Sequence, residues 1–147
     1  MRYSLADYIL TVAIPPSVAS EFGLDTISIG GEGSYVGSID IDKPTSLYST
    51  EGDSTGSWIH NKNLNKTGSV SVSLNQLAPQ VEQLKNLFKI YEKSSTISEG
   101  LTLQLTNEEE TIAVCTDCYI QRVPTQSFGP TAQTQTWSFT CGRIDYD

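Results

Sequence analysis

The segment "GSVSVSL", residues 68–74, determines how the rest of the chain is interpreted. In it Val70, Val72 and Leu74 alternate with three serines. Successive side chains of a β-strand point to opposite faces, so this period of two separates an apolar face from a hydroxyl face. The segment therefore predicts a strand with one face in a protein core and the other face in contact with water.

The same alternation continues on both sides of this segment. Residues 8–14 form an alternating run that Pro15 and Pro16 end, and Trp137, Phe139 and Cys141 share one face of a run at 134–141. Further short runs, separated by Gly, Asn and Asp, lie at 34–42, 46–51, 58–63, 101–106 and 111–120. The last two runs flank a short turn at 107–110 and predict a hairpin.

One region has a helical period instead. Within residues 79–93, apolar side chains recur three and four positions apart, at Val81, Leu84, Leu87, Phe88 and Tyr91. A proline at position 79 suits the first turn of a helix. Residues 17–23 predict a turn or a short helical piece. The predicted fold class is mainly β with one main helix against the side of a sheet, in a single domain spanning 1–147.

Charge and hydropathy exclude several classes of protein. The formal net charge is −8 and the pI about 4.5, which disfavours conventional DNA or RNA binders and proteins that bind anionic membranes. No apolar run approaches transmembrane length, and the N-terminal segment has no small-residue cleavage site. We therefore expect residues 8–14 to be the first strand of a protein made and kept in the cytoplasm.

Four glycines in "SIGGEGSYVGSID", residues 28–40, come close to the spacing of a phosphate-binding loop. Such loops work because a helix N-terminus follows them and presents free N–H groups to the phosphate. Here an alternating strand follows, and no Lys-Ser or Lys-Thr pair is present. The glycines predict a bend and a close backbone approach, placed where a long hairpin leaves the sheet, and no nucleotide.

Three cysteines raise the question of a metal site. In a regular strand Cys115 and Cys118 would point to opposite faces, whereas a bulge at 116–117 would bring them together. With Cys141 and His60 they would nominally supply four zinc ligands. We expect three free thiols without metal or cofactor, with Cys141 buried beside Trp137 and Phe139.

No set of residues predicts catalysis. His60 is the only histidine and lacks an evident orienting partner, and Glu51 and Asp53 lack the ligand spacing of a calcium loop. Trp58 and Trp137 are typical of core or interface anchors. The sequence predicts a protein that is not an enzyme.

The segments "STEGDSTGSWIHNKNLNKTGSVSVSLNQ" and "CYIQRVPTQSFGPTAQTQTWSFTCGRIDYD" resemble the tail tube proteins of contractile-tailed bacteriophages. The N-terminal segments "YSLADYILTVAIP" and "ISIGGEGSYVGSIDI" are similar to the same family, so the resemblance covers nearly the whole chain. It implies two packed antiparallel sheets forming a small barrel, a helix on its side, and arms at residues 1–8 and 43–66 that contact neighbouring subunits.

The resemblance also implies a function. Hexameric rings would stack into the inner tube of a phage tail, assembled in the cytoplasm of the host bacterium. The implied partners are further copies of the chain, the tail sheath protein, the baseplate and tail terminator proteins, and the tape-measure protein and genomic DNA inside the bore. A baseplate-proximal tube initiator and a phage-derived bacteriocin tube remain alternatives within this resemblance, and a β-sandwich binding module and a small metal-dependent enzyme remain alternatives outside it.

Strand alternation then predicts which side chains line the bore. The polar face comprises Ser38, Asp40, Asp42, Ser69, Ser71 and Ser73, with Glu51 and Asp53 as further acidic candidates. The opposite face, predicted to be the core, comprises Tyr35, Ile39, Val70 and Val72. An acidic, hydroxyl-lined wall would repel DNA phosphates and leave the duplex free to slide.

Overall fold

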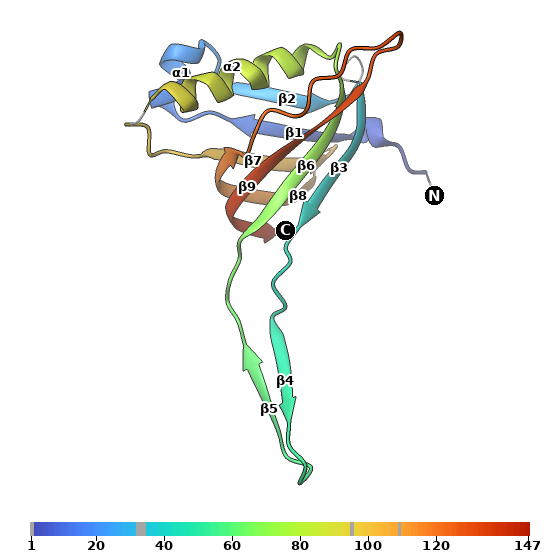
Figure 1. The fold of residues 1–147 in the computed structure, drawn as a ribbon, viewed down its shortest axis with the longest axis vertical. Helices are drawn as coiled ribbons and strands as arrows, with labels where there is room; N and C mark the ends of the chain where they lie inside the picture. Colours follow the sequence, from blue (N-terminus) through green and yellow to red (C-terminus); the bar gives the residue numbers. More distant parts are fainter. Residues whose placement is uncertain (1, 32–34, 95, 109) are drawn as a thin grey trace.

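Seven of the nine strands pair side by side in one strongly curled antiparallel sheet (Figure 1). The computed structural model describes residues 2–31, 35–94, 96–108 and 110–147. Along the sheet the order is β2-β1-β7-β8-β9-β6-β3, and a second sheet consists of β4 and β5 alone. The elements are η1 (Leu5–Asp7), β1 (Tyr8–Ala13), α1 (Pro16–Phe22), β2 (Thr26–Gly30), β3 (Val36–Asp42), β4 (Tyr48–Gly52), β5 (Trp58–Lys62), β6 (Gly68–Asn75), α2 (Pro79–Lys93), β7 (Leu101–Asn107), β8 (Glu110–Ile120) and β9 (Thr134–Tyr146).

The concave side of the curled sheet holds the core, and α2 lies across its open end (Figure 1). Trp137 and Phe139 are its largest fully buried side chains, and Val70, Val72 and Leu74 of β6 are also fully buried. Leu84 and Leu87 of α2 complete the core. The mainly β fold with a helix at 79–93 on its side is confirmed. The wall of the barrel is one continuous curled sheet, and the small second sheet is a hairpin outside it.

The hairpin β4–β5 extends far from the sheet and ends in a free tip (Figure 1). All ten of its strand residues are exposed, so it buries nothing against its own subunit. It leaves the sheet after Asp42 and returns at Gly68, at the end opposite α2 (Figure 1). The N-terminal segment also extends away from the body (Figure 1).

The glycine-rich segment lies at the other end of the sheet from the hairpin, so its predicted location was wrong. Gly30 nevertheless performs the predicted task of close approach, because a Cβ there would overlap the Tyr8 carbonyl of the neighbouring strand. Its φ of 135° is also one that L side chains rarely adopt. Gly33 lies outside the described residues.

The predicted core position of Tyr35 was also wrong. Tyr35 precedes β3 with a φ of 51° and is 66% exposed. The pairing of β3 with β6 shifts register between Val36 and Ser38, which moves the alternation by one residue. Val36 therefore packs against the core together with Ile39 and Ile41.

Of the two alternatives for β8, the regular strand that turns Cys115 and Cys118 to opposite sides was wrong, and the alternative with a bulge at 116–117 is the one observed. Asp117 has a φ of 55°, and in the pairing with β7 three residues of β8 span two of β7 at this point, whereas the pairing with β9 continues without a shift. Both cysteines are consequently buried on the core side. A Cβ on Gly100 would lie 2.6 Å from Asp117 Oδ1 and 2.9 Å from its Cα, so this glycine makes room for the bulge.

We predict that Gly100→Ala destabilises the subunit by about 1–3 kcal/mol, because the added methyl group forces the bulged backbone to shift. Gly129→Ala is the matched control, since a Cβ there meets only the Gln133 amide at 3.7 Å. Urea unfolding of the unassembled subunits measures both. Equal stability of the two variants would contradict this role of Gly100.

Candidate assembly surfaces

Three rows of polar side chains cross strands β3, β6 and β9 on the face turned away from the core. Ser38 Oγ donates to Ser73 Oγ at 3.2 Å, and Ser73 lies 3.4 Å from the Thr136 hydroxyl. In the next row Ser71 Oγ lies 3.4 Å from Ser138 Oγ. The register gives the rows as Ser38–Ser73–Thr136, Asp40–Ser71–Ser138 and Asp42–Ser69–Thr140.

The structure thus brings all six residues predicted for the bore onto one surface. The serines are half-buried by their neighbours, whereas Asp40 and Asp42 are exposed on the edge strand. Three residues that were not predicted for this surface, Thr136, Ser138 and Thr140, also lie on it. The alternation of β9 places them there, because Trp137 and Phe139 occupy the opposite, buried side. We call this surface the hydroxyl face.

Glu51 and Asp53 do not lie on the hydroxyl face but on the hairpin, toward its tip. Asp53 Oδ1 accepts hydrogen bonds from the Thr55 hydroxyl at 2.7 Å and from the Thr55 and Ser57 amides at 2.9 and 3.0 Å. These bonds lower the pKa of Asp53, the Thr55 hydroxyl contributing most. Asp53 therefore holds the turn that joins β4 to β5.

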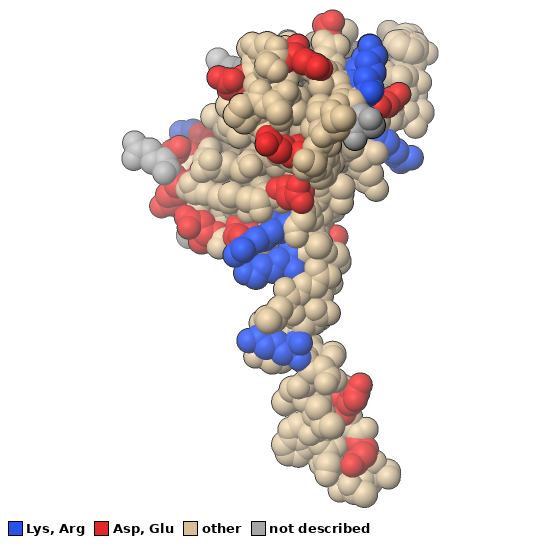
Figure 2. Space-filling view, turned by 90° about the vertical axis from the view of Figure 1, so that its left-hand side faces the viewer, with Lys and Arg blue, Asp and Glu red and all other residues tan. Residues whose placement is uncertain are grey.

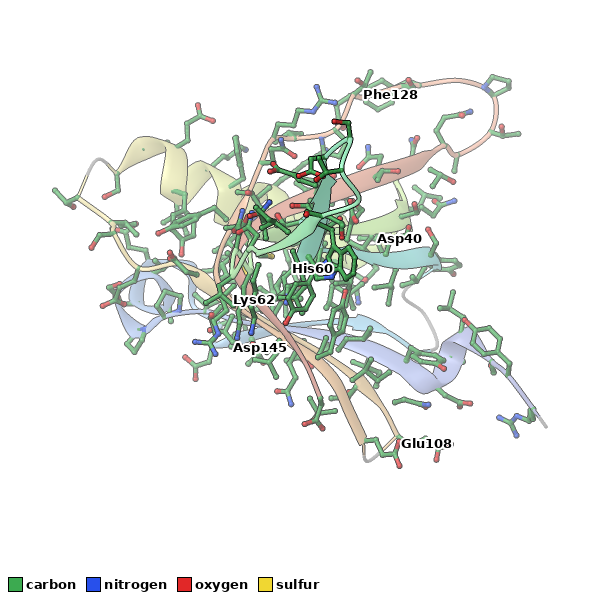
Figure 3. All side chains as sticks on the ribbon, turned by 90° about the horizontal axis from the view of Figure 1, so that it is seen from below. Asp40, His60, Lys62, Glu108, Phe128 and Asp145 are labelled. Carbon is green, nitrogen blue, oxygen red and sulfur yellow. The ribbon has the colours of Figure 1, made fainter. Side chains whose placement is uncertain are left out.

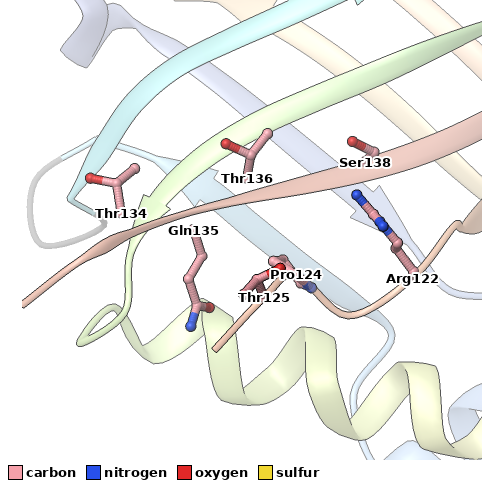
Figure 4. A pocket seen from close by; sticks show the side chains of 7 residues that line it. All are labelled: Arg122, Pro124, Thr125, Thr134, Gln135, Thr136 and Ser138. Atoms are coloured by element: carbon pink, nitrogen blue, oxygen red, sulfur yellow. The ribbon is translucent and has the colours of Figure 1, made fainter. Parts of the chain in front are cut away.

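At the end of the hydroxyl face lies a pocket of about 280 Å³ that the sequence did not reveal. Figure 4 shows Thr134, Thr136 and Ser138 on one side of β9 and Gln135 pointing toward α2 on the other. Arg122 lines the pocket from the loop after β8. No pattern marks this arginine in the sequence, because it lies in an irregular segment whose amide at Gln121 bonds to the Ser138 carbonyl.

Basic side chains gather where the hairpin leaves the sheet (Figure 2). Lys43 Nζ donates to the Ile144 carbonyl at 3.1 Å, and Lys66 and Arg143 approach Asp145 at 3.4 and 2.7 Å. The Arg143 guanidinium lowers the pKa of Asp145. This arrangement fixes the β9 end against the base of the hairpin, although the pairs are exposed and each adds little stability.

The hairpin carries two different faces because its cross-strand register is regular. Tyr48, Trp58, His60 and Lys62 share one face, and His60 Nδ1 lies 2.9 Å from the Thr50 hydroxyl. Ser49, Glu51, Ile59 and Asn61 share the other. Figure 3, a view from below, shows His60 and Lys62 on the hairpin and Asp40 on β3. Trp58 and Ile59 are 68% and 61% exposed, and neither has a partner in the described part of its own subunit.

The three cysteines meet in the core rather than at a surface. Cys118 and Cys141 are register partners on β8 and β9, and Cys115 contacts Cys141. The hydrogen bond with Cys141 and burial raise the pKa of Cys115. A hydrogen bond from Cys115 lowers the pKa of Cys141, but contact with Cys118 and burial outweigh it and raise the value to about 12.

His60 lies on the hairpin and is not brought to the cysteines. Within the described ranges, no group of three or more His, Cys, Asp or Glu side chains has the arrangement of a metal site. Nor, in that same part of the chain, is any helix long and apolar enough to cross a membrane.

In the part of the chain that the structure describes, the extended arm has no partner in its own subunit, and exposed strand edges of this kind invite pairing with another chain. The family model described as "Bacteriophage PhiTE tail tube protein" matches residues 17–147. The chain therefore belongs to this family of phage tail tube proteins, and its role is structural.

Two solved structures share the fold at low sequence identity. One is described as the sheath-tube complex of an extracellular contractile injection system, PVC, in its extended state; it is 12% identical, with a TM-score of 0.60, over 99% of this chain and 91% of that one. The other is the tube-terminating cap of the anti-feeding prophage, 10% identical, with a TM-score of 0.53, over 100% and 93%. Among curated proteins, none matches the chain.

We predict that all three thiols are inert in the folded subunit, because a thiol reacts as its thiolate and burial disfavours that form. A thiol reagent such as DTNB should label none of Cys115, Cys118 and Cys141 at pH 8 and all three in urea. Labelling of any of them in folded protein at the rate of a free thiol would contradict the prediction.

A second prediction concerns the hairpin turn and pH. Because the folded-state pKa of Asp53 is lowered, its contribution is present above the unfolded pKa and is lost as pH falls through the folded value. The protection factors of the Thr55 and Ser57 amides, which correct for the intrinsic slowing of exchange in acid, should fall in that acidic window, and in Asp53→Ala they should already be low above it. Glu51→Ala is the control, since its carboxylate accepts no hydrogen bond from the described residues. Unchanged exchange in Asp53→Ala would exclude this role of the carboxylate.

Proposed function

We propose that the chain forms hexameric rings that stack into the inner tube of a contractile phage tail, the conduit for DNA ejection. One observation carries the proposal: the hairpin exposes Trp58, Ile59, Leu47 and Leu64 without covering them in its own subunit. Several large apolar side chains exposed together mark a surface that another molecule covers. Membership of the tail tube family supports another copy of the chain as that molecule.

The edge strand β3 gives a second reason for self-assembly. Its outer backbone groups have no strand partner, because β3 ends the sheet. An unpaired edge invites pairing with another chain, and a closed ring removes such edges. Asp40 and Asp42 on this strand oppose uncontrolled pairing through their charge.

In the ring, the hydroxyl face is the wall of the bore, and the core side with α2 lies outward. Double-stranded DNA carries one negative charge about every 1.7 Å along its axis, so a basic wall would retain it. The hydroxyl groups of the rows bind water at the wall and carry no positive charge. The carboxylates of Asp40 and Asp42 repel the DNA phosphates. Tape-measure protein and genomic DNA occupy this bore in turn, without specific binding.

The outer surface contacts the sheath, and the tube ends contact baseplate and terminator proteins. A sheath-tube complex and a tube-terminating cap are among the structures that share the fold, which supports these partners. Negative-stain microscopy of the purified protein at high concentration tests the assembly. Rings or tubes are expected, and a protein that stays monomeric under those conditions would overturn the proposal.

We predict that Asp40→Lys with Asp42→Lys slows DNA release from assembled particles, most strongly at low salt, where screening is weakest. Glu21→Lys with Glu92→Lys is the matched control, because it makes the same charge change on exposed positions of α1 and α2. A dye that reports released DNA measures both. Equal release kinetics in the two double variants would exclude an electrostatic role for the bore.

A further inference from the structure

The end of the subunit opposite the hairpin carries a groove that could receive a hairpin. At the end away from the hairpin, a groove of about 440 Å³ runs along the start of α2. Leu77 and Pro79 form its exposed apolar part, and Val81, which also lines it, is buried. Lys85 and Lys89 form its basic part and outnumber the carboxylate among its lining residues, Glu82. Leu77 is 74% exposed, so its side chain is available to a partner.

The basic part of the groove has charges that are not neutralised. Lys85 Nζ donates to Gln126 Oε1 at 2.9 Å, a neutral partner. No carboxylate in the described segments forms an ion pair with Lys85 or Lys89. The groove thus combines an exposed apolar patch with positive charge, and an occupant that fits it needs an apolar side chain beside a carboxylate.

One face of the hairpin meets this requirement. Glu51 and Ile59 are direct register partners on β4 and β5, so their side chains lie next to each other on one face. The opposite face carries Trp58 but also Lys62, whose Nζ lies 5.9 Å from the centre of the Tyr48 ring. Lys62 would meet Lys85 and Lys89 with like charge, so charge selects the Glu51–Ile59 face.

The other grooves of the subunit fit this occupant less well. The pocket beside Arg122 is lined mainly by hydroxyl and amide groups. A groove near the end of α2 has Ile90 as its only apolar side chain among basic and polar ones. A groove lined by Phe88, Tyr91, Tyr119 and Ile120 is more apolar, but its charged lining residue is Glu92, which would repel Glu51. Among these grooves in the described part of the chain, the one at the start of α2 combines an apolar surface for Ile59 with two lysines for Glu51.

We propose that Ile59 of one copy packs against Leu77 and Pro79 of a second copy, with Glu51 paired to Lys85 and Lys89 of that copy. This contact rests on the proposed function, since it requires that copies of the chain stack. The two surfaces differ and lie at opposite ends of the subunit (Figure 1), so the contact is head-to-tail. It repeats along the stack without closing on itself.

A photo-crosslinking amino acid maps the contact directly. With benzoylphenylalanine at position 59, tubes of the full chain should cross-link to residues 77–89 of another copy, as read by peptide mass spectrometry. The same amino acid at position 58 is the matched control, because it points from the opposite face. Tubes in which position 59 cross-links elsewhere would overturn this contact while leaving the tube intact, whereas absence of tubes from the unmodified protein would overturn both proposals.

Charge exchange provides an independent test. Glu51→Lys alone, and Lys85→Glu with Lys89→Glu alone, should each raise the concentration needed for tube growth about tenfold, which corresponds to about 1.4 kcal/mol. An equimolar mixture of the two variants should restore growth, because the basic arm then fits the acidic groove. Asp25→Lys is the control for net charge. Failure of the mixture to recover would exclude the pairing of Glu51 with these lysines.

Discussion

The rest of the structure depends on one constraint, the alternation of apolar and hydroxyl side chains along β6, which lies between two neighbouring strands. β6 pairs with β3 on one side and with β9 on the other, and all three strands keep apolar and hydroxyl side chains in register. A slip of one residue would place serines in the core and Val70 and Val72 in water. Because the apolar side is fully buried, the register is fixed, and with it the position of every side chain in the hydroxyl rows.

This constraint also explains how much of the structure could be predicted from the sequence. Strands with a strict period of two, such as β6 and β9, were predicted with their correct faces, and so was the amphipathic helix at 79–93. The six residues predicted for the polar face share one surface because each lies on such a strand. Where the backbone departs from the period, periodicity did not decide the faces: Tyr35 was placed on the wrong face, and at Asp117 the bulge stood only as an alternative to a regular strand, because positive φ angles and bulges leave little trace in hydrophobic periodicity.

Position in three dimensions was the other limit. Glu51 and Asp53 were grouped with the polar face by residue type, yet they lie on the hairpin, which no alternation argument relates to the sheet. Arg122 lies beside the hydroxyl rows only because the chain after β8 runs back along β9. A signal for the bulge did exist in the sequence: an aspartate in β8, a glycine directly before β7 at position 100 and a glycine in β9 at position 142 leave space for an extra residue.

The placement of the arm at one end and the groove at the other gives any stack of these subunits a polarity. In the proposed tube, one terminal ring would present free hairpins with uncovered apolar side chains, and the other would present empty grooves. The two ends are chemically unlike, so proteins that start and stop the tube must recognise different surfaces. The end with free hairpins also bears the greater cost of remaining in water, which makes it the end where a cap is most strongly stabilised.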